Sequence, residues 1–125
     1  VEKGIDTGDI YLKENLELKG SATEIFRRAN YIIQKMIISI LENKNKPIPQ
    51  KGKVTIFKRR TPEQSNIINL ETLQKVYDQI RMLDADGYPK AYLESKFLKL
   101  EFKEANFKNK NEIKATVSIK IKKDD

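Results

Sequence analysis

One long stripe of apolar residues at helical spacing constrains the fold of this chain more than any other sequence feature. The stripe consists of Ile25, Ala29, Ile32, Ile33, Met36, Ile37, Ile40 and Leu41. This spacing predicts an α-helix of about five turns with one apolar face. Ser21 and Glu24 form a capping-box pattern at its start, and Pro47 and Pro49 require the helix to end near residues 43–45. The apolar face of this helix must be buried against another part of the protein.

A second, shorter helix and an antiparallel sheet are predicted in the rest of the chain. The helix is expected to start with Asn69 as its cap and to end before the turn signal Asp86-Gly87. Apolar residues then alternate around residues 91–102 and again over residues 113–121. Alternation of this kind predicts two or three antiparallel strands.

These elements predict an α+β chain made of the end of one domain and a small second domain. Residues 1–46 are expected to form the end of an α/β domain, with a strand or loose hairpin over residues 9–18 and then the long helix. Residues 47–68 are a basic linker that includes a short strand at residues 54–57, and residues 69–125 form the small α+β domain.

The residue types present restrict the chemistry that the chain can carry. Its 125 residues include no cysteine and no histidine, which excludes disulfides, thiolate metal sites and histidine-based acid–base schemes. Asp84 and Asp86 are interpreted as a helix-ending turn, and no metal site is expected. No apolar run approaches the roughly 20 residues that span a bilayer, so we expect no membrane partner and a cytoplasmic location.

A loop near the amino terminus is the first candidate functional segment. Gly4 and Gly8 bracket Asp6, which gives a tight loop in which the backbone can approach a ligand closely. The simplest interpretation is a turn in which Asp6 hydrogen-bonds to its own backbone. A second interpretation of this loop rests on a family resemblance that includes the residues after it.

Three stretches of the chain resemble one enzyme family. Ile5–Asp9, with the sequence IDTGD, is followed by a capped helix and resembles the loop that ends the catalytic domain of N10-formyltetrahydrofolate-dependent transferases. Arg59–Glu63, with the sequence RRTPE, is similar to the stretch with which amino-sugar formyltransferases enter their second domain, although Gln64 and Ser65 replace an Asp and a Gly. Residues 80–93 resemble a helix-to-strand passage of that second domain. The chain therefore resembles the carboxy-terminal portion of the methionyl-tRNA formyltransferase-like family.

The resemblance implies a reaction and roles for particular residues. Members of the family move a formyl group from N10-formyltetrahydrofolate to a primary amine, which is carried by methionyl-tRNA or by a nucleotide-linked amino sugar. By resemblance, Asp6 is the catalytic carboxylate that assists proton removal from the attacking amine. Gly4, Ile5 and Thr7 are the matching loop residues, and they are expected to contact the pterin of the folate.

The resemblance also implies that part of the active site is supplied by residues outside this chain. The family uses an asparagine and a histidine to stabilise the negative charge that develops on the formyl oxygen. The chain has no histidine, so we expect its 125 residues to be catalytically inactive alone. The expected partner is the rest of the catalytic domain, and the first helix should expose the apolar face on which that domain docks.

Basic residues gather in one segment whose role stays open. The net charge is +7, and residues 44–60 alone contribute +7 without an acidic residue, from Lys44, Lys46, Lys51, Lys53, Lys58, Arg59 and Arg60. One interpretation is a solvated linker. In the other, Arg59 and Arg60 bind substrate, either the phosphates of a nucleotide-linked sugar or a tRNA backbone.

Two other functions compete with the formyltransferase reading. In the first, the chain is a basic nucleic-acid-binding module without catalysis, and Asp6 is only a turn residue. Base stacking is not part of that reading, because Tyr88 and Tyr92 are expected to pack against the sheet. In the second, the chain is a dimerisation piece, and the apolar face around Ile33 packs against its copy in a homodimer.

Overall fold

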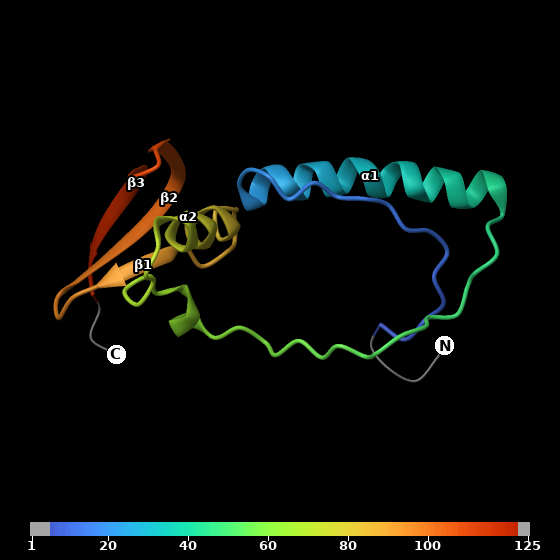
Figure 1. Cartoon of the computed structure of the whole chain (residues 1–125), viewed down its shortest axis with the longest axis horizontal. Helices are drawn as coiled ribbons and strands as arrows, with labels where there is room; N and C mark the ends of the chain where they lie inside the picture. The colour runs from blue at the N-terminus through green and yellow to red at the C-terminus, as the bar shows by residue number, and fades with distance from the viewer. Residues whose placement is uncertain (1–5, 123–125) are drawn as a thin grey trace. The chain divides into compact units, whose positions relative to one another are not determined.

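The computed structural model of the chain describes residues 6–122 (Figure 1). The residues divide into two compact units, and each is described by itself. Within the described residues, unit 1 comprises residues 6–18 and 25–58, and unit 2 comprises residues 19–24 and 59–122. The division between Lys58 and Arg59 falls inside the segment that the sequence analysis assigns to a linker.

The predicted first helix is confirmed as α1, which spans Ala22–Asn43. Its capping box forms as expected: the Ser21 backbone N–H donates to Glu24 Oε2 at 2.8 Å, and the Glu24 N–H donates to Ser21 Oγ at 3.3 Å. Gly20 precedes the cap at a φ of 84°, and a Cβ there would lie 2.3 Å from Glu24 Oε2. Only glycine therefore combines this backbone conformation with this cap.

The expected apolar surface on α1 is confirmed in part, because Ile33, Ile37 and Leu41 of the eight residues in the predicted stripe are exposed. Large apolar side chains remain exposed along the helix, with Leu41 at 73% exposure. The exposed residues are Phe26, Tyr31, Ile33, Ile37, Ile38 and Leu41. Exposed apolar side chains of this kind are typical of a helix face that another surface covers.

Two short strands expected from the sequence are not formed, which corrects the prediction. Residues 9–18 contain only an isolated antiparallel bridge, in which Ile10 and Ile48 exchange two backbone hydrogen bonds of 2.9 Å. Residues 54–57 are extended without any strand pairing, and Ile56 is 87% exposed. A strand requires a hydrogen-bonded neighbour along its length, and among the described residues the first segment has one only at Ile10 and the second has none.

Unit 2 consists of a three-stranded antiparallel sheet with a helix against one face (Figure 1). The strands are β1 (Ala91–Glu94), β2 (Leu98–Asn109) and β3 (Glu112–Ile121), in the order β1-β2-β3. The helix is α2, Leu73–Met82, and it contacts β2 and β3. The predicted helix and strands of the second domain are thus confirmed.

Helix α2 begins three residues later than expected. Thr72 is its cap, since Thr72 Oγ1 accepts a hydrogen bond of 3.2 Å from the Lys75 backbone N–H. Asn69 instead belongs to a turn that the Leu70 N–H closes by donating to the Ile67 carbonyl. Threonine and asparagine both favour the cap position, and the competing turn decides which one is used.

The core of unit 2 lies between α2 and the sheet. Its buried residues are Ile67, Ile80, Leu83, Ala91 and Ala105. The register pairs Ala91 with Phe102 and Phe102 with Val117, so these side chains share the face that α2 covers. The same face continues beyond the helix to Ile119 and Ile121, which are 64% and 81% exposed.

The opposite face of the sheet is charged. The ammonium group of Lys120 on β3 donates a hydrogen bond to Glu101 on β2, and that of Lys99 lies 3.5 Å from the other oxygen of the same carboxylate. These two cations, led by the hydrogen bond from Lys120, hold the pKa of Glu101 below its ordinary value. Lys122, which follows β3, pairs with Glu94 on β1 at 3.4 Å.

Glu101→Gln should weaken the chain in a pH-dependent way. Because the pKa of Glu101 is lower in the folded state, its stabilisation is complete above about pH 4.3, the usual value for an unfolded Glu, and is lost as the pH falls through the folded value. Thermal unfolding should therefore separate wild type and variant near neutral pH and bring them together at a pH below the folded pKa of Glu101.

Glu71→Gln is the matched control, because the Glu71 side chain is 81% exposed in its pair with Lys75. It should leave the unfolding temperature nearly unchanged at both pH values. An equal loss of stability for Glu101→Gln at both pH values would show that packing, not charge, is what Glu101 contributes.

Candidate functional site

The loop that carries Asp6 is held by one side chain from elsewhere in unit 1. Gln50 Nε2 donates to the Asp6 carbonyl at 2.9 Å and to the Gly8 carbonyl at 2.8 Å. Asp6 has a left-handed backbone conformation, with a φ of 58°. A non-glycine residue in this region is uncommon, and the two hydrogen bonds from Gln50 help to fix it.

The carboxylate of Asp6 is exposed and has no hydrogen-bond or ionic partner among residues 6–122. The simplest interpretation, in which the Asp6 side chain hydrogen-bonds to its own backbone in a turn, is therefore not supported by the described contacts. A Cβ at Gly8 would meet no atom within 4 Å, so the space beside the loop is open. Thr7 is exposed in the same loop, whereas Gly4 and Ile5 lie outside the described residues.

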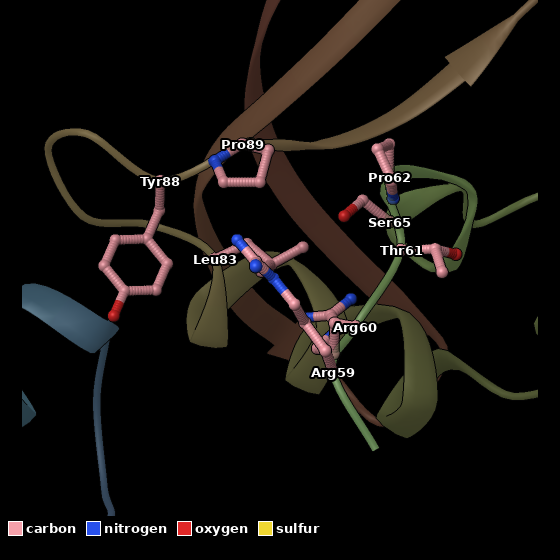
Figure 2. Close-up of a pocket in the computed structure, with 8 residues that line it drawn as sticks. All are labelled: Arg59, Arg60, Thr61, Pro62, Ser65, Leu83, Tyr88 and Pro89. Carbon is pink, nitrogen blue, oxygen red and sulfur yellow. The ribbon is translucent and has the colours of Figure 1, made fainter.

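A second candidate site is an open depression of about 690 Å³ in unit 2 (Figure 2). Its lining residues are Arg59, Arg60, Thr61, Pro62, Ser65, Leu83, Tyr88 and Pro89. Figure 2 shows the two arginine side chains leaving one segment, with Tyr88 and Pro89 on a separate loop. Two guanidinium groups and an aromatic ring thus border the same space.

The segment that carries the arginines is fixed by a short 3-10 helix, Pro62–Ser65. The Thr61 backbone N–H donates to Gln64 Oε1 at 2.9 Å, and Arg60 Nη2 donates to the Gln64 carbonyl at 3.0 Å. Gln79 on α2 donates to that carbonyl as well, which ties the segment to the helix. The Arg60 position is therefore set by the fold and not by a free linker.

Much of the positive charge beside this depression is left unneutralised. Arg59 has no hydrogen-bond or ionic partner in the part of the chain that the structure describes. Glu63 is the nearest acidic residue in sequence, and a hydrogen bond from Thr61 lowers the pKa of its carboxyl. Glu63 is thus an anion engaged by a neighbouring side chain, and no ion pair links it to Arg59 within the described residues.

Tyr88 lies at this depression and not against the sheet, which corrects the expectation for that residue. It follows Gly87, whose φ is 75°, in a turn closed by a hydrogen bond of 3.3 Å from the Tyr88 N–H to the Ala85 carbonyl. The tyrosine is 47% exposed. Tyr92 does lie on the sheet, with the Lys99 ammonium 4.5 Å above its ring centre.

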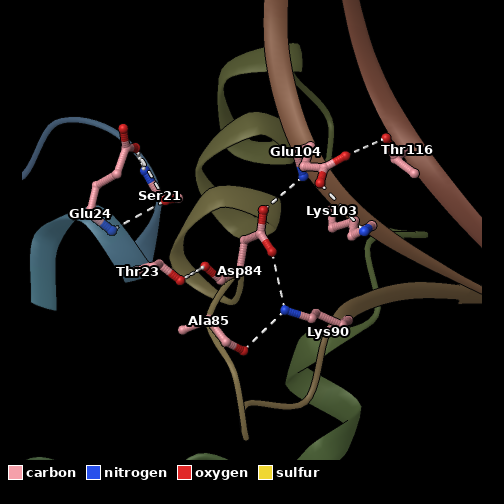
Figure 3. Close-up of polar contacts among 9 residues, drawn as sticks. All are labelled: Ser21, Thr23, Glu24, Asp84, Ala85, Lys90, Lys103, Glu104 and Thr116. Carbon is pink, nitrogen blue, oxygen red and sulfur yellow. Dashed lines mark hydrogen bonds and ion pairs between the residues drawn. The ribbon is translucent and has the colours of Figure 1, made fainter. Parts of the chain in front are cut away.

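Asp84 fixes the loop that presents Tyr88 and Pro89 (Figure 3). Its carboxylate pairs with the Lys90 ammonium at 3.1 Å and accepts a hydrogen bond of 2.7 Å from the Glu104 backbone N–H. Its carbonyl accepts from the N–H of Thr23 at 3.2 Å and from Thr23 Oγ1 at 3.0 Å. Asp84 is thus structural, and the interpretation of this region as a helix-ending turn agrees with these contacts.

The contact with Glu104 supports an irregularity in β2. The register between β2 and β3 shifts between Lys103 and Asn106, and Glu104 has a φ of 55°. Such a bulge inserts one residue into a strand, and its left-handed position normally favours glycine. The hydrogen bonds from its N–H to Asp84 and from Thr116 Oγ1 to its carboxylate, the latter at 2.7 Å, hold this conformation (Figure 3).

Part of each candidate site was predicted from the sequence. Asp6 and Thr7 share the loop in unit 1, and Arg59 and Arg60 share the depression in unit 2. The position of Tyr88 was not predicted, because a tyrosine between a glycine and a proline gives no signal of which side chains it will face. Within the described residues, no group of three or more acidic, histidine or cysteine side chains could hold a metal ion. No helix among them is long and apolar enough to cross a membrane.

Comparisons with known proteins agree with the resemblance seen in the sequence. A family model described as "Methionyl-tRNA formyltransferase, C-terminal domain" matches residues 62–120. The solved structure of the methionyl-tRNA formyltransferase from Clostridium thermocellum matches with a TM-score of 0.91 and 47% identity, over 98% of this chain and 54% of that chain. The methionyl-tRNA formyltransferase of Campylobacter jejuni subsp. jejuni is 29% identical over 106 residues, which are 81% of this chain and 34% of that protein.

The helix-on-sheet fold of unit 2 and the matched segment define a carboxy-terminal domain of the formyltransferase type. The chain belongs to the methionyl-tRNA formyltransferase-like family and corresponds to the carboxy-terminal portion of its members. It spans about half the length of the solved relative and about a third of the Campylobacter protein.

Asp84→Ala should destabilise the chain by about 2 to 3 kcal/mol, because it leaves the partly buried Lys90 ammonium and the Glu104 N–H without their acceptor. Chemical denaturation measures the loss. Asp86→Ala is the control, since Asp86 is exposed two residues away, and it should change the unfolding free energy by less than about 0.5 kcal/mol. Equal effects of the two substitutions would contradict the structural role of Asp84.

Proposed function

We propose that the longer protein to which this chain corresponds transfers a formyl group from N10-formyltetrahydrofolate to a primary amine. The observation that carries this proposal is the Asp6 loop, in which an exposed carboxylate without a partner among residues 6–122 follows the pattern of the family loop. The family match supports the reaction class.

In this proposal Asp6 acts as the general base. A primary amine must lose a proton as its nitrogen forms the new bond to the formyl carbon, and a positioned carboxylate can accept that proton. The hydrogen bonds from Gln50 orient the backbone of the loop, so the carboxylate does not depend on a mobile segment for its position. No contact among the described residues has to break before Asp6 can accept the proton.

The folate supplies the formyl group when it is bound, and this chain contributes only one side of its site. Open space beside Gly8 and the exposed Thr7 fit a loop that approaches a planar ring from one side. Gly4 and Ile5, which the resemblance also assigns to the cofactor, lie outside the described residues.

The rest of the catalytic domain is the proposed partner of α1. Ile37, Ile38 and Leu41 expose apolar surface along this helix, and a docked domain would remove that surface from water. The chain alone is then inactive, because it has no histidine to stabilise the charge on the formyl oxygen. The proposal places the whole enzyme in the cytoplasm.

The acceptor amine is proposed to belong to a molecule that carries phosphate. Arg59 and Arg60 present two guanidinium groups at one depression, and guanidinium binds phosphate oxygens through paired hydrogen bonds. Methionyl-tRNA and a nucleotide-linked amino sugar both meet this requirement, and the names of the relatives favour the tRNA.

Asp6→Asn in the full-length protein should reduce formyl transfer by roughly 10²- to 10⁴-fold, because an amide cannot accept the proton. Labelled N10-formyltetrahydrofolate is offered with methionyl-tRNA and, separately, with nucleotide-linked amino sugars. Asp9→Asn is the control, since Asp9 is also exposed in the same loop, and it should retain activity. Full activity of Asp6→Asn would overturn the assignment of the base, and the preferred amine identifies the acceptor.

A second candidate function is RNA binding without catalysis. The seven basic residues between Lys44 and Arg60 are all exposed, and no acidic residue interrupts them. This reading predicts that the chain alone binds RNA of any sequence, and that the affinity falls steeply as salt releases condensed counterions. Little affinity for RNA at low salt would exclude it.

A further inference from the structure

We propose that the depression in unit 2 is a binding site for a nucleoside phosphate, with the phosphates on Arg59 and Arg60 and the base on Tyr88. The inference deepens the proposed assignment of the two arginines to the substrate and rests on it. It adds the chemical class of the bound group and a third residue, Tyr88, that recognises it.

The charged side of the depression fits a phosphate group. Arg59 has no hydrogen-bond or ionic partner within residues 6–122, so its guanidinium donors are available to a ligand. Arg60 uses Nη2 to hold the Gln64 carbonyl, and a guanidinium has five N–H donors, so others remain. Two adjacent guanidinium groups on a fixed segment match the several oxygens of a phosphate or diphosphate.

The other side of the depression fits a planar ring better than a bare anion. It is lined by the exposed Tyr88 ring together with Pro89, Pro62 and the buried Leu83. A nucleobase gains about 1–3 kcal/mol by stacking on an aromatic side chain. Phosphate alone gains nothing from such a wall.

The size and rigidity of the site support the same class. A volume of about 690 Å³ is within the range of about 300–1,000 Å³ typical of small-molecule sites, and it far exceeds that of a single phosphate. Both walls are fixed before any ligand arrives, the first by the contacts of Gln64 and the second by Asp84. Pre-organised walls reduce the entropy lost on binding.

Uridine diphosphate is the first probe, and nuclear magnetic resonance of the labelled chain is the readout. The probe should shift the amide signals of Arg60, Ser65 and Tyr88 and leave those of α1 from Ile33 onward unchanged. Pyrophosphate and uridine should each bind at least about tenfold more weakly, because each uses only one wall. Binding of pyrophosphate as tight as that of the diphosphate would reduce the site to an anion site, and no shift at millimolar probe would overturn the proposal.

Variants separate the two walls from a general effect of charge. Arg59→Gln and Tyr88→Ala should each weaken binding of uridine diphosphate about tenfold, whereas Tyr88→Phe keeps the ring and should bind within about twofold of wild type. Lys53→Gln removes the same charge outside the depression and should have no effect beyond that range. An equal loss for Lys53→Gln and Arg59→Gln would show that binding is diffuse electrostatic attraction.

Two further arms identify the source of the nucleotide and keep this proposal separate from the catalytic one. A single-stranded RNA trinucleotide that binds more tightly than uridine diphosphate assigns the site to the end of an RNA, and the reverse order assigns it to a free nucleotide-linked molecule.

Asp6→Asn should bind the probe as wild type does. The site can therefore stand if the catalytic role of Asp6 fails, and it falls if the probe does not bind. Unchanged signals of Ala91 in each variant establish that the sheet is intact.

Discussion

The carboxylate and carbonyl of Asp84 are the contacts on which the rest of unit 2 depends. Four hydrogen bonds or ion pairs meet at this residue, and they come from Thr23, Lys90 and Glu104. These partners belong to the start of α1, the approach to β1 and the bulge of β2. A charged acceptor that is mostly removed from water and fully engaged is worth more than a surface ion pair, because water competes less for it.

Features encoded by neighbouring residues were predictable from the sequence, and features that depend on distant partners were not. The capping box at Ser21 follows from local hydrogen-bonding chemistry, and it formed where expected. The strand expected at residues 54–57 did not form, because the alternation of apolar residues along a segment does not show whether a partner strand exists. The start of α2 moved to Thr72, since a local turn occupied Asn69.

The same distinction separates the residues of the candidate sites that were predicted from the one that was not. Asp6, Arg59 and Arg60 were selected because each lies in a short contiguous pattern. Tyr88 lines the same depression as the arginines because of the fold of unit 2, since almost thirty residues separate it from them in the chain. No spacing rule connects two segments at that separation, so the second wall of the depression required the structure.

The sheet of unit 2 also has an outer edge, because β3 has a neighbouring strand on one side only within the described residues. A ten-residue edge with Ile119 and Ile121 exposed is a template on which another chain could add a strand. Lys114 and Lys120 lie on this strand, and repulsion between like charges opposes the stacking of identical edges. The charge of these lysines therefore opposes edge-to-edge association of the chain, a role that requires no bound ligand.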